Sequence, residues 1–383
     1  MTDPTDEHTT GISRREFVHL SACAAGGAAL GACGSPTEAG EPTAQVAAVR
    51  GTNLDAMTRD VLNGLGGIQT VVHQDETVFI KPNIVTLPWA VQGNPFAAGE
   101  CTKPEIVVAV AEECLRAGAS EVIIGDGSHA PSLPWEYAMT LDRSTNLVAE
   151  AARLRSAYNR TVRTASLEVD SPQWVEVPSD TYLGVIAVSS LVADADRVIS
   201  IPVAKTHSWA QLTLSLKNFI GITPLERYGD LPDTPDRGVV FDHSSPRAIA
   251  AIYLDIVQGV QPDLAVVDFS IGVEGNGPNL GHGGRTVNMR DRLGSWLLLA
   301  STDLVAADAT AARIMSHDPE DVTQLAMGYN MGLGEFREER IELLGERLDD
   351  LRVSWAPAQL QNQLSSRHGE CPMQTCMGTQ TYV

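Results

Sequence analysis

Basic residues and long apolar runs are scarce in this 383-residue chain. Against 48 Asp and Glu there are 27 Lys and Arg, which gives a formal net charge of −21. Nucleic acids are bound through clustered Lys and Arg, so the sequence predicts no nucleic-acid partner. After residue 33, no apolar run reaches the roughly 20 residues that a membrane-spanning helix needs.

Several familiar catalytic motifs are also missing. The chain has no Gly-x-Ser-x-Gly elbow, no His-Glu-x-x-His sequence, no Walker lysine loop and no zinc-type cysteine spacing. These absences exclude the common serine-hydrolase, zinc-protease and P-loop classes. Any chemistry must therefore be inferred from less familiar clusters of polar residues.

Cysteines are few, and two of the six fall within the first 33 residues. The other four suit disulfides or free thiols outside the cytoplasm. Their spacing fits neither usual ferredoxin pattern, which argues against an iron–sulfur cluster. Two of them are close enough in sequence to close a small disulfide loop. The four are Cys101, Cys114, Cys371 and Cys376.

The N-terminus carries a targeting signal. Arg14 and Arg15 precede a short apolar run over 20–30, which ends in Leu-Gly-Ala-Cys at Cys33. This layout is typical of a cleaved signal and is too short for a membrane span. It resembles a twin-arginine export signal followed by a lipobox. We therefore expect a signal peptide over 1–32 read by the twin-arginine export machinery, and an exported lipoprotein held on the periplasmic or cell-surface side by lipidated Cys33.

The rest of the chain reads as one α/β domain. A Pro/Gly/Ser/Thr-rich stretch predicts a flexible tether over 33–45, and a polar C-terminal tail is expected over 353–383. Between them, over 46–352, strands alternate with helices, which predicts a mostly parallel sheet with helices on both faces in a single large domain. The expected strands cover 46–49, 77–80, 121–124, 197–201, 264–268 and 294–300. The expected helices cover 54–65, 104–117 with Thr102 as its cap, 146–158, 247–258 and 304–315.

Polar clusters follow four of these strands, where ligands bind in a parallel α/β sheet. Lys81 and Asn83 follow the second strand, and Asp126 and Ser128 follow the third. A solvated lysine at a Pro-ended strand and a plain Gly-Asp-Gly turn are the alternative interpretations. Both clusters nevertheless suit a polar or anionic ligand.

The third and densest cluster runs from Lys205 through His207 to Lys217 and Asn218. The fourth cluster begins at Asp268, where the expected strand over 264–268 ends. The predicted catalytic residues are Lys205, His207, Lys217 and Asp268. The predicted substrate-binding residues are Lys81, Asn83, Ser128, Asn218, Gly275, Asn276 and Gly277. The candidate metal ligands are Asp126, His207, Asp268 and Glu274. Asp303 and Asp308 are weaker candidates, and Asp303 also suits a helix N-cap.

Taken together and in this order, the clusters resemble the family known as domain of unknown function 362. The matching stretches are Val78–Asn83, Val122–Gly127, Lys205–His207 with Thr213–Gly221, Val266–Asp268 with Glu274–Pro278, and Thr302–Asp303 with Asp308–Ala311. The resemblance covers roughly 45–345 and implies one α/β domain. It also implies a link to iron–sulfur proteins, because some members carry ferredoxin-type modules. This chain has no such module.

Three functions remain open from the sequence. The first is an exported enzyme that acts on a small anionic or polar metabolite through a Lys/His/carboxylate site, with or without a divalent metal. The second is a non-catalytic ligand-binding lipoprotein that uses the same cleft. The third is a metal or iron–sulfur redox protein. The enzyme hypothesis requires Lys205, His207 and Asp268 to share one site.

Overall fold

The computed structural model describes residues 41–90, 93–229 and 237–360. The predicted export arginines Arg14 and Arg15, the lipidation site Cys33, and Cys371 and Cys376 lie outside these residues. No helix in the described ranges is both long enough and apolar enough to cross a membrane.

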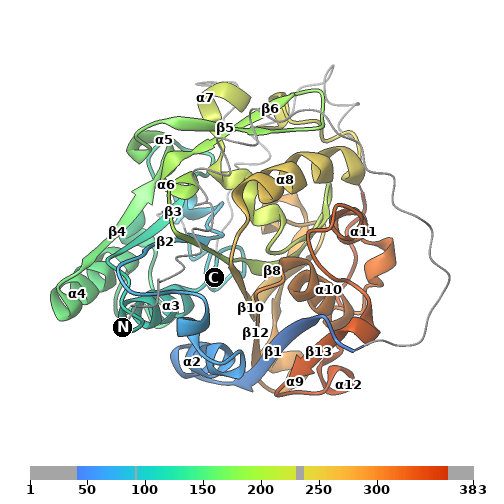
Figure 1. The fold of residues 1–383 in the computed structure, drawn as a ribbon. Helices are drawn as coiled ribbons and strands as arrows, with labels where there is room; N and C mark the ends of the chain where they lie inside the picture. The colour runs from blue at the N-terminus through green and yellow to red at the C-terminus, as the bar shows by residue number, and fades with distance from the viewer. Residues whose placement is uncertain (1–40, 91–92, 230–236, 361–383) are drawn as a thin grey trace, which may run out of the picture.

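One large sheet organises the molecule (Figure 1). Its main path runs β13-β1-β12-β10-β7-β2-β3-β4. The strands from β10 through β4 pair in parallel, whereas β1 and β12 join this half through antiparallel ladders. The strands on the path are β13 (Ile341–Leu344), β1 (Ala44–Gly51), β12 (Trp296–Ser301), β10 (Leu264–Gly275), β7 (Arg197–Ile201), β2 (Thr77–Pro82), β3 (Glu121–Asp126) and β4 (Thr161–Ser166).

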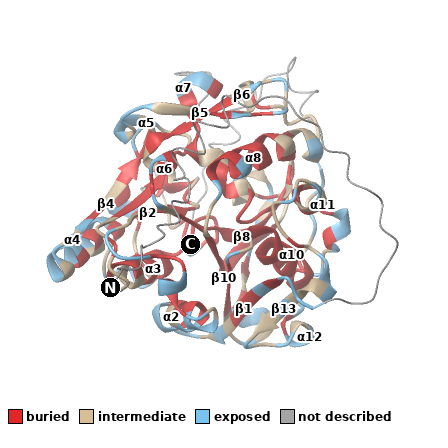
Figure 2. Cartoon of the chain, viewed as in Figure 1, coloured by how far each residue is buried: buried red, intermediate tan, exposed pale blue. Residues whose placement is uncertain are grey.

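Helices cover both faces of this sheet, as the sequence predicts. Successive strand residues point to opposite faces, and in β2 Val78 and Ile80 enter one core while Phe79 enters the other. Helices α2, α3 and α4 lie over the first core, and α8 and α10 lie over the second. Figure 2 shows the buried residues gathered in the sheet and on the inner sides of these helices. The predicted single α/β domain is confirmed.

The helix boundaries follow local signals. Asn53, Asn146, Ser245 and Asp303 each cap a helix by accepting a backbone N–H, so the N-cap interpretation of Asp303 is confirmed. The helices are α2 (Leu54–Gly64), α3 (Pro104–Arg116), α4 (Leu147–Tyr158), α5 (Leu167–Asp170), α6 (Ser190–Ala193), α7 (Leu225–Tyr228), α8 (Pro246–Val260), α9 (Met289–Leu293), α10 (Leu304–Ile314), α11 (Thr323–Asn330) and α12 (Leu348–Leu351).

The predicted capping role of Thr102 is wrong. Lys103 is the N-cap of α3, and no side chain caps this helix. The Thr102 hydroxyl instead donates to the Ile201 carbonyl at 2.6 Å and accepts the Asn83 N–H at 3.0 Å. It therefore ties the ends of β2 and β7 together.

The sheet continues past the ends of its parallel strands. After Pro202 the chain of β7 resumes as β8 (Val203–His207), which pairs with the second half of β10. Strands β9 (Gln211–Thr213) and β11 (Gly284–Asn288) extend this region on either side, and β5 (Trp174–Pro178) pairs with β6 (Val185–Ser189) as a separate ribbon. The extension carries Lys205 and His207 beyond the carboxyl ends of the parallel strands.

The packed domain runs past the predicted boundary at residue 352. The Val353 N–H donates to the Ile314 carbonyl, and the Trp355 side chain is only 2% exposed. Ala356 exchanges hydrogen bonds with the Gly275 N–H and the Glu274 carboxylate. The first residues of the predicted polar tail therefore pack on β10.

Candidate functional site

The chain contains only four lysines, and its other 23 basic residues are arginine. All four lie in one neighbourhood near the carboxyl ends of the parallel strands, on β2, before α3, on β8 and after β9. Three of them, Lys81, Lys103 and Lys205, are at most 1% exposed. Arginine stays charged in proteins, whereas lysine can lose its proton when buried. The distribution of lysine therefore marks this region as chemically distinct.

Lys81 forms a buried ion pair at the end of β2. Its Nζ lies 2.5 Å from Oδ1 of Asp126 at the end of β3. Asn218 steadies the pair, because its amide nitrogen donates to the Lys81 carbonyl at 2.8 Å and its Oδ1 accepts from Lys81 Nζ at 3.4 Å. Three predicted site residues are thus brought together, and their charges are balanced.

Lys103 forms the second buried pair. Its Nζ lies 3.3 Å from Asp268 Oδ2, and its backbone N–H donates to the same oxygen at 3.1 Å. The other oxygen, Asp268 Oδ1, accepts two hydrogen bonds from Ser270. Burial lowers the pKa of the Lys103 ammonium, although the negative charge of Asp268 opposes this shift. Asp268 therefore balances a lysine that the sequence motifs did not single out.

Lys205 is held differently from the other two buried lysines. Its Nζ donates to Asn83 Oδ1 at 3.0 Å and to the Glu100 carbonyl at 2.8 Å, and in the described residues no ion pair joins it to a carboxylate. Burial lowers the pKa of the Lys205 ammonium to about 8. At pH 7 about a tenth of this lysine is therefore neutral, far more than of a lysine with the ordinary pKa.

His207 lies two residues further along β8 and is 4% exposed. Its Nδ1 accepts the Trp209 N–H at 3.1 Å, and the Trp209 ring packs edge-on against His282 at 5.3 Å. Burial lowers the pKa of His207 well below its usual value, and the positive charges of Lys217, His243, Lys205 and His282 lower it further. A neutral imidazole in positive surroundings results.

The loop after β10 is fixed by contacts within the chain. Thr206 donates to the Gly275 carbonyl at 2.7 Å, Ser208 donates to the Gly277 carbonyl, and Asn276 Oδ1 accepts the Gln359 N–H. A side-chain carbon on Gly277 would approach the Thr206 carbonyl to 2.1 Å. The three predicted substrate-binding residues of this loop thus hold it against β8 and the tail.

Ser128 also serves an internal contact. Its hydroxyl donates to the Val85 carbonyl, and its own carbonyl accepts from Arg237 at 3.3 Å. It therefore joins the turn after β3 to the segment after β2, beside the Lys81 pair.

The predicted metal ligands do not form a metal centre together. Across residues 41–90, 93–229 and 237–360, no group of three or more His, Cys, Asp or Glu side chains could hold an ion. Asp126 and Asp268 are each paired with a lysine, and Glu274 is paired with Arg292 at 2.7 Å. Burial raises the pKa of Glu274, but the hydrogen bonds from Arg292 and the Ala356 N–H and the charges of Arg292 and Arg285 together outweigh burial, so the pKa falls. The three predicted carboxylate ligands are therefore divided among separate ion pairs, and His207 instead accepts the Trp209 N–H.

The two described cysteines are free thiols. Cys101 and Cys114 are both buried, and burial raises the pKa of Cys101 to about 11. The sequence leaves disulfides and free thiols open, and Cys101 and Cys114 are free thiols.

Asp308, a weaker candidate, accepts hydrogen bonds from the segment that precedes Lys217. It accepts the Ser215 and Leu216 N–H groups at 2.9 and 3.1 Å, and the Ser215 hydroxyl as well. Burial raises the pKa of Asp308 to about 7. Its contacts assign it a structural role.

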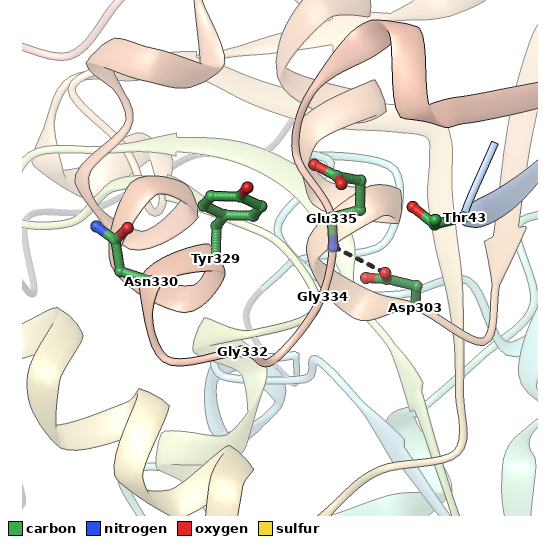
Figure 3. A pocket seen from close by; sticks show the side chains of 7 residues that line it. All are labelled: Thr43, Asp303, Tyr329, Asn330, Gly332, Gly334 and Glu335. Carbon is green, nitrogen blue, oxygen red and sulfur yellow. Dashed lines mark hydrogen bonds between the residues drawn. The ribbon is translucent and has the colours of Figure 1, made fainter. Parts of the chain in front are cut away.

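A separate open hollow lies at the other end of the sheet (Figure 3). It is lined by Thr43, Asp303, Tyr329, Asn330, Gly332, Gly334 and Glu335. Asp303 follows β12, whose end pairs with the start of β10, whereas Lys205 pairs with Val273 near the end of β10. The Asp303 carboxylate already accepts the Ala306 and Glu335 N–H groups at 2.8 Å each. This hollow is therefore distinct from the lysine site.

A family model described as "Domain of unknown function (DUF362)" matches residues 78–313. The chain belongs to this family. The matched DUF362 region runs from β2 into α10 and includes all four lysines. Its description supplies no reaction.

Individual relatives are more distant. A thylakoid-associated protein of Synechocystis sp. is 26% identical over 283 residues, which make up 73% of this chain and 76% of that protein. A crystal structure of a Thermotoga maritima protein matches with a TM-score of 0.31 and 14% identity, over 59% of this DUF362 chain and 53% of its own. The lactate racemase apoprotein of Thermoanaerobacterium thermosaccharolyticum matches with a TM-score of 0.32 and 11% identity, over 60% and 51%. The chain thus spans about half the length of these two structures.

Sequence reasoning missed Lys103 and Glu100. Neither follows a predicted strand, so the rule that places ligands at strand ends did not find them. The signal that could have found Lys103 is composition, since every lysine of the chain lies in this region.

Proposed function

We propose that this chain is an exported, membrane-associated enzyme that acts on a small anionic metabolite, with Lys205 as the proton acceptor. The observation that carries the proposal is the set of four lysines in a chain whose other basic residues are arginine. One of them is a buried amine that forms no ion pair with a carboxylate among the described residues. Lysine is the basic residue that can act as a base when its pKa is lowered.

The proposed step moves one proton. The neutral Lys205 amine takes a proton from a substrate C–H or O–H group and becomes an ammonium ion, while the electron pair stays on the substrate. Hydrogen bonds from Nζ to Asn83 Oδ1 and the Glu100 carbonyl hold the amine in place before and after the proton transfer. Because Lys205 is buried, the substrate reaches it only after the surrounding chain opens.

His207 is suited to stabilise the charge left on the substrate. Its Nδ1 accepts a backbone N–H, so the neutral ring carries its proton on Nε2 and can donate from there. Since its pKa is lowered by burial, the ring donates without itself being charged. A donor placed where negative charge develops lowers the barrier to proton removal.

The surroundings favour an anionic substrate. Beside burial, the positive charge of Lys217 is the next largest cause that lowers the pKa of His207. The molecule as a whole has a formal charge of −21, whereas all four lysines of the chain lie in this region. A small carboxylate or phosphate ester is therefore the substrate class we propose.

Membrane association has separate support. The N-terminal sequence resembles an export signal with a lipidation site at Cys33, and a 26% identical relative is described as thylakoid-associated. We propose the same kind of attachment for this chain, on the exported side.

Solvent exchange tests the catalytic proposal. Small carboxylates and phosphate esters with an acidic C–H would be incubated with the protein in D₂O, and deuterium incorporation followed by NMR. We expect exchange that rises with pH and levels off above about pH 8, where Lys205 is neutral. Lys205→Arg should lower the rate by about 100-fold or more, because arginine keeps its proton.

A control variant and two possible results decide between the hypotheses. Arg227→Lys, at an exposed ion pair with Glu176, should leave the exchange rate unchanged. Binding of an acid without any exchange would favour the non-catalytic lipoprotein. An exchange rate that Lys205→Arg leaves intact would overturn the assignment of the base.

A further inference from the structure

Glu100 is a fully buried carboxylate beside Lys205, and the proposed reaction has not yet used it. Its backbone carbonyl accepts Lys205 Nζ at 2.8 Å. Its side chain is 0% exposed, and Oε1 accepts the Leu280 N–H at 2.9 Å. The other oxygen, Oε2, is buried and has no hydrogen-bond partner in the described residues.

This arrangement leaves a donor and an acceptor without partners in one buried region. A buried carboxylate oxygen without a hydrogen bond lowers stability, because its lost hydration is not replaced. The Lys205 ammonium carries three N–H groups, and only two have described acceptors. One water molecule between them would accept from Lys205 and donate to Glu100, satisfying both.

We propose that Glu100 is the proton outlet of Lys205, connected to it by one bridging water. The inference rests on the proposed function and adds the route by which the base is regenerated. After Lys205 has taken the substrate proton and the product has left, the water occupies the third position on Nζ. The ammonium then passes one proton to this water, and the water passes one of its own protons to Glu100 Oε2. Lys205 returns to the neutral amine, Glu100 becomes the carboxylic acid, and the water is unchanged. When the surrounding chain opens, Glu100 releases this proton to bulk water and becomes the carboxylate again.

The local fold fixes Glu100 in position. Gly99 has φ +84, and a side-chain carbon there would lie 2.3 Å from the Gly272 carbonyl oxygen. The segment before α3 can therefore lie flat on β10 only with glycine at this position. Leu280 holds the carboxylate from the loop after β10, so Glu100 also links the two segments beside Lys205.

The test uses the small number of lysines. In the full mature chain labelled with ¹³C at lysine Cε, NMR should give four lysine signals, each assigned by a Lys→Arg variant. The Lys205 signal would be titrated in the wild type, in Glu100→Gln and in Glu105→Gln. Glu105 is the matched control, because it also has one buried oxygen without a partner.

We expect Glu100→Gln to lower the pKa of Lys205 by about 0.5 unit or more, since a carboxylate that favours the ammonium is removed. Glu105→Gln should leave that pKa unchanged. An unchanged Lys205 pKa in Glu100→Gln would overturn the proposal, whether or not the wild type catalyses exchange. The absence of wild-type exchange would instead overturn the proposed function.

Chemical rescue adds a second readout. Glu100→Ala should lower the exchange rate, and added acetate should restore much of it by acting as the missing proton acceptor. Acetate should not restore Lys205→Arg, which lacks the base itself. A Glu100→Ala rate that acetate leaves low, in a protein with the four folded lysine signals, would contradict the relay.

Discussion

At the scale of single residues, three buried lysines differ in what balances them. Lys81 and Lys103 each have a carboxylate at ion-pair distance, whereas Lys205 has two neutral acceptors. A buried ion pair survives the loss of one partner poorly, because the other charge is left unpaired. An unpaired buried ammonium, by contrast, costs stability while it is present.

Replacing each lysine by methionine should separate these roles. Lys81→Met and Lys103→Met should lower the free energy of unfolding by about 3–5 kcal/mol, because Asp126 or Asp268 is left as an unpaired buried charge. Lys205→Met should leave stability equal or higher at pH 7, with activity lost. Urea unfolding of the three variants measures the difference, and a Lys205→Met loss as large as the other two would assign Lys205 to structure.

The lowered pKa of Lys205 also predicts how the free energy of unfolding depends on pH. The pKa of Lys205 is lowered to about 8 in the folded protein, while in the unfolded chain it is about 10.4. Between these values the unfolded chain binds more protons, so stability rises with pH across that window. Below pH 8 the full penalty of about 3 kcal/mol applies. Lys205→Met should remove this rise, which gives the stability comparison a second check.

Residue patterns predicted much of this site because strand ends converge at one edge of a sheet. Lys81, Lys205, His207 and Asp268 follow predicted strands, and the structure places them together. The sequence pattern did not predict which lysine pairs with which carboxylate. Asp268 faces Lys103 rather than a metal, because the segment before α3 folds back over β10.

At the scale of elements, the structure agrees with the sequence where periodicity is strong. The helix predicted over 104–117 is α3, Pro104–Arg116, and the strand predicted over 197–201 is β7. The sheet extension was not predicted, because β9 has three residues and β8 continues β7 across a proline. The packing of the first tail residues on β10 was not predicted either, since one tryptophan among polar residues carries no periodic signal.

That tryptophan gives a prediction for β10. Trp355 packs edge-on against Phe269 at 5.8 Å and is 2% exposed. Trp355→Ala should lower the free energy of unfolding by about 3–5 kcal/mol, measured by urea titration. Leu360→Ala, at a side chain that is 53% exposed, is the control and should change stability by less than about 0.5 kcal/mol. Equal effects of the two variants would mean that the tail does not dock on β10.

At the scale of the whole molecule, charge and targeting predict how the protein is held at its membrane. A formal charge of −21 opposes adhesion of the folded domain to anionic lipid, so the membrane attachment that we propose should depend on the proposed lipid at Cys33. The domain itself offers no spanning helix among its described residues. Export and attachment are therefore separable by mutation.

Cell fractionation of three variants tests this separation. Arg14→Lys with Arg15→Lys keeps the positive charge but removes both guanidinium groups, so a recognition specific for arginine predicts retention inside the cell. Cys33→Ala should be exported and then recovered in the soluble fraction, because it has no acyl anchor. Cys23→Ala, within the signal, should behave like the wild type. Cys33→Ala that stays in the membrane fraction would show that the acidic domain has a protein partner there, since its charge disfavours the lipid surface.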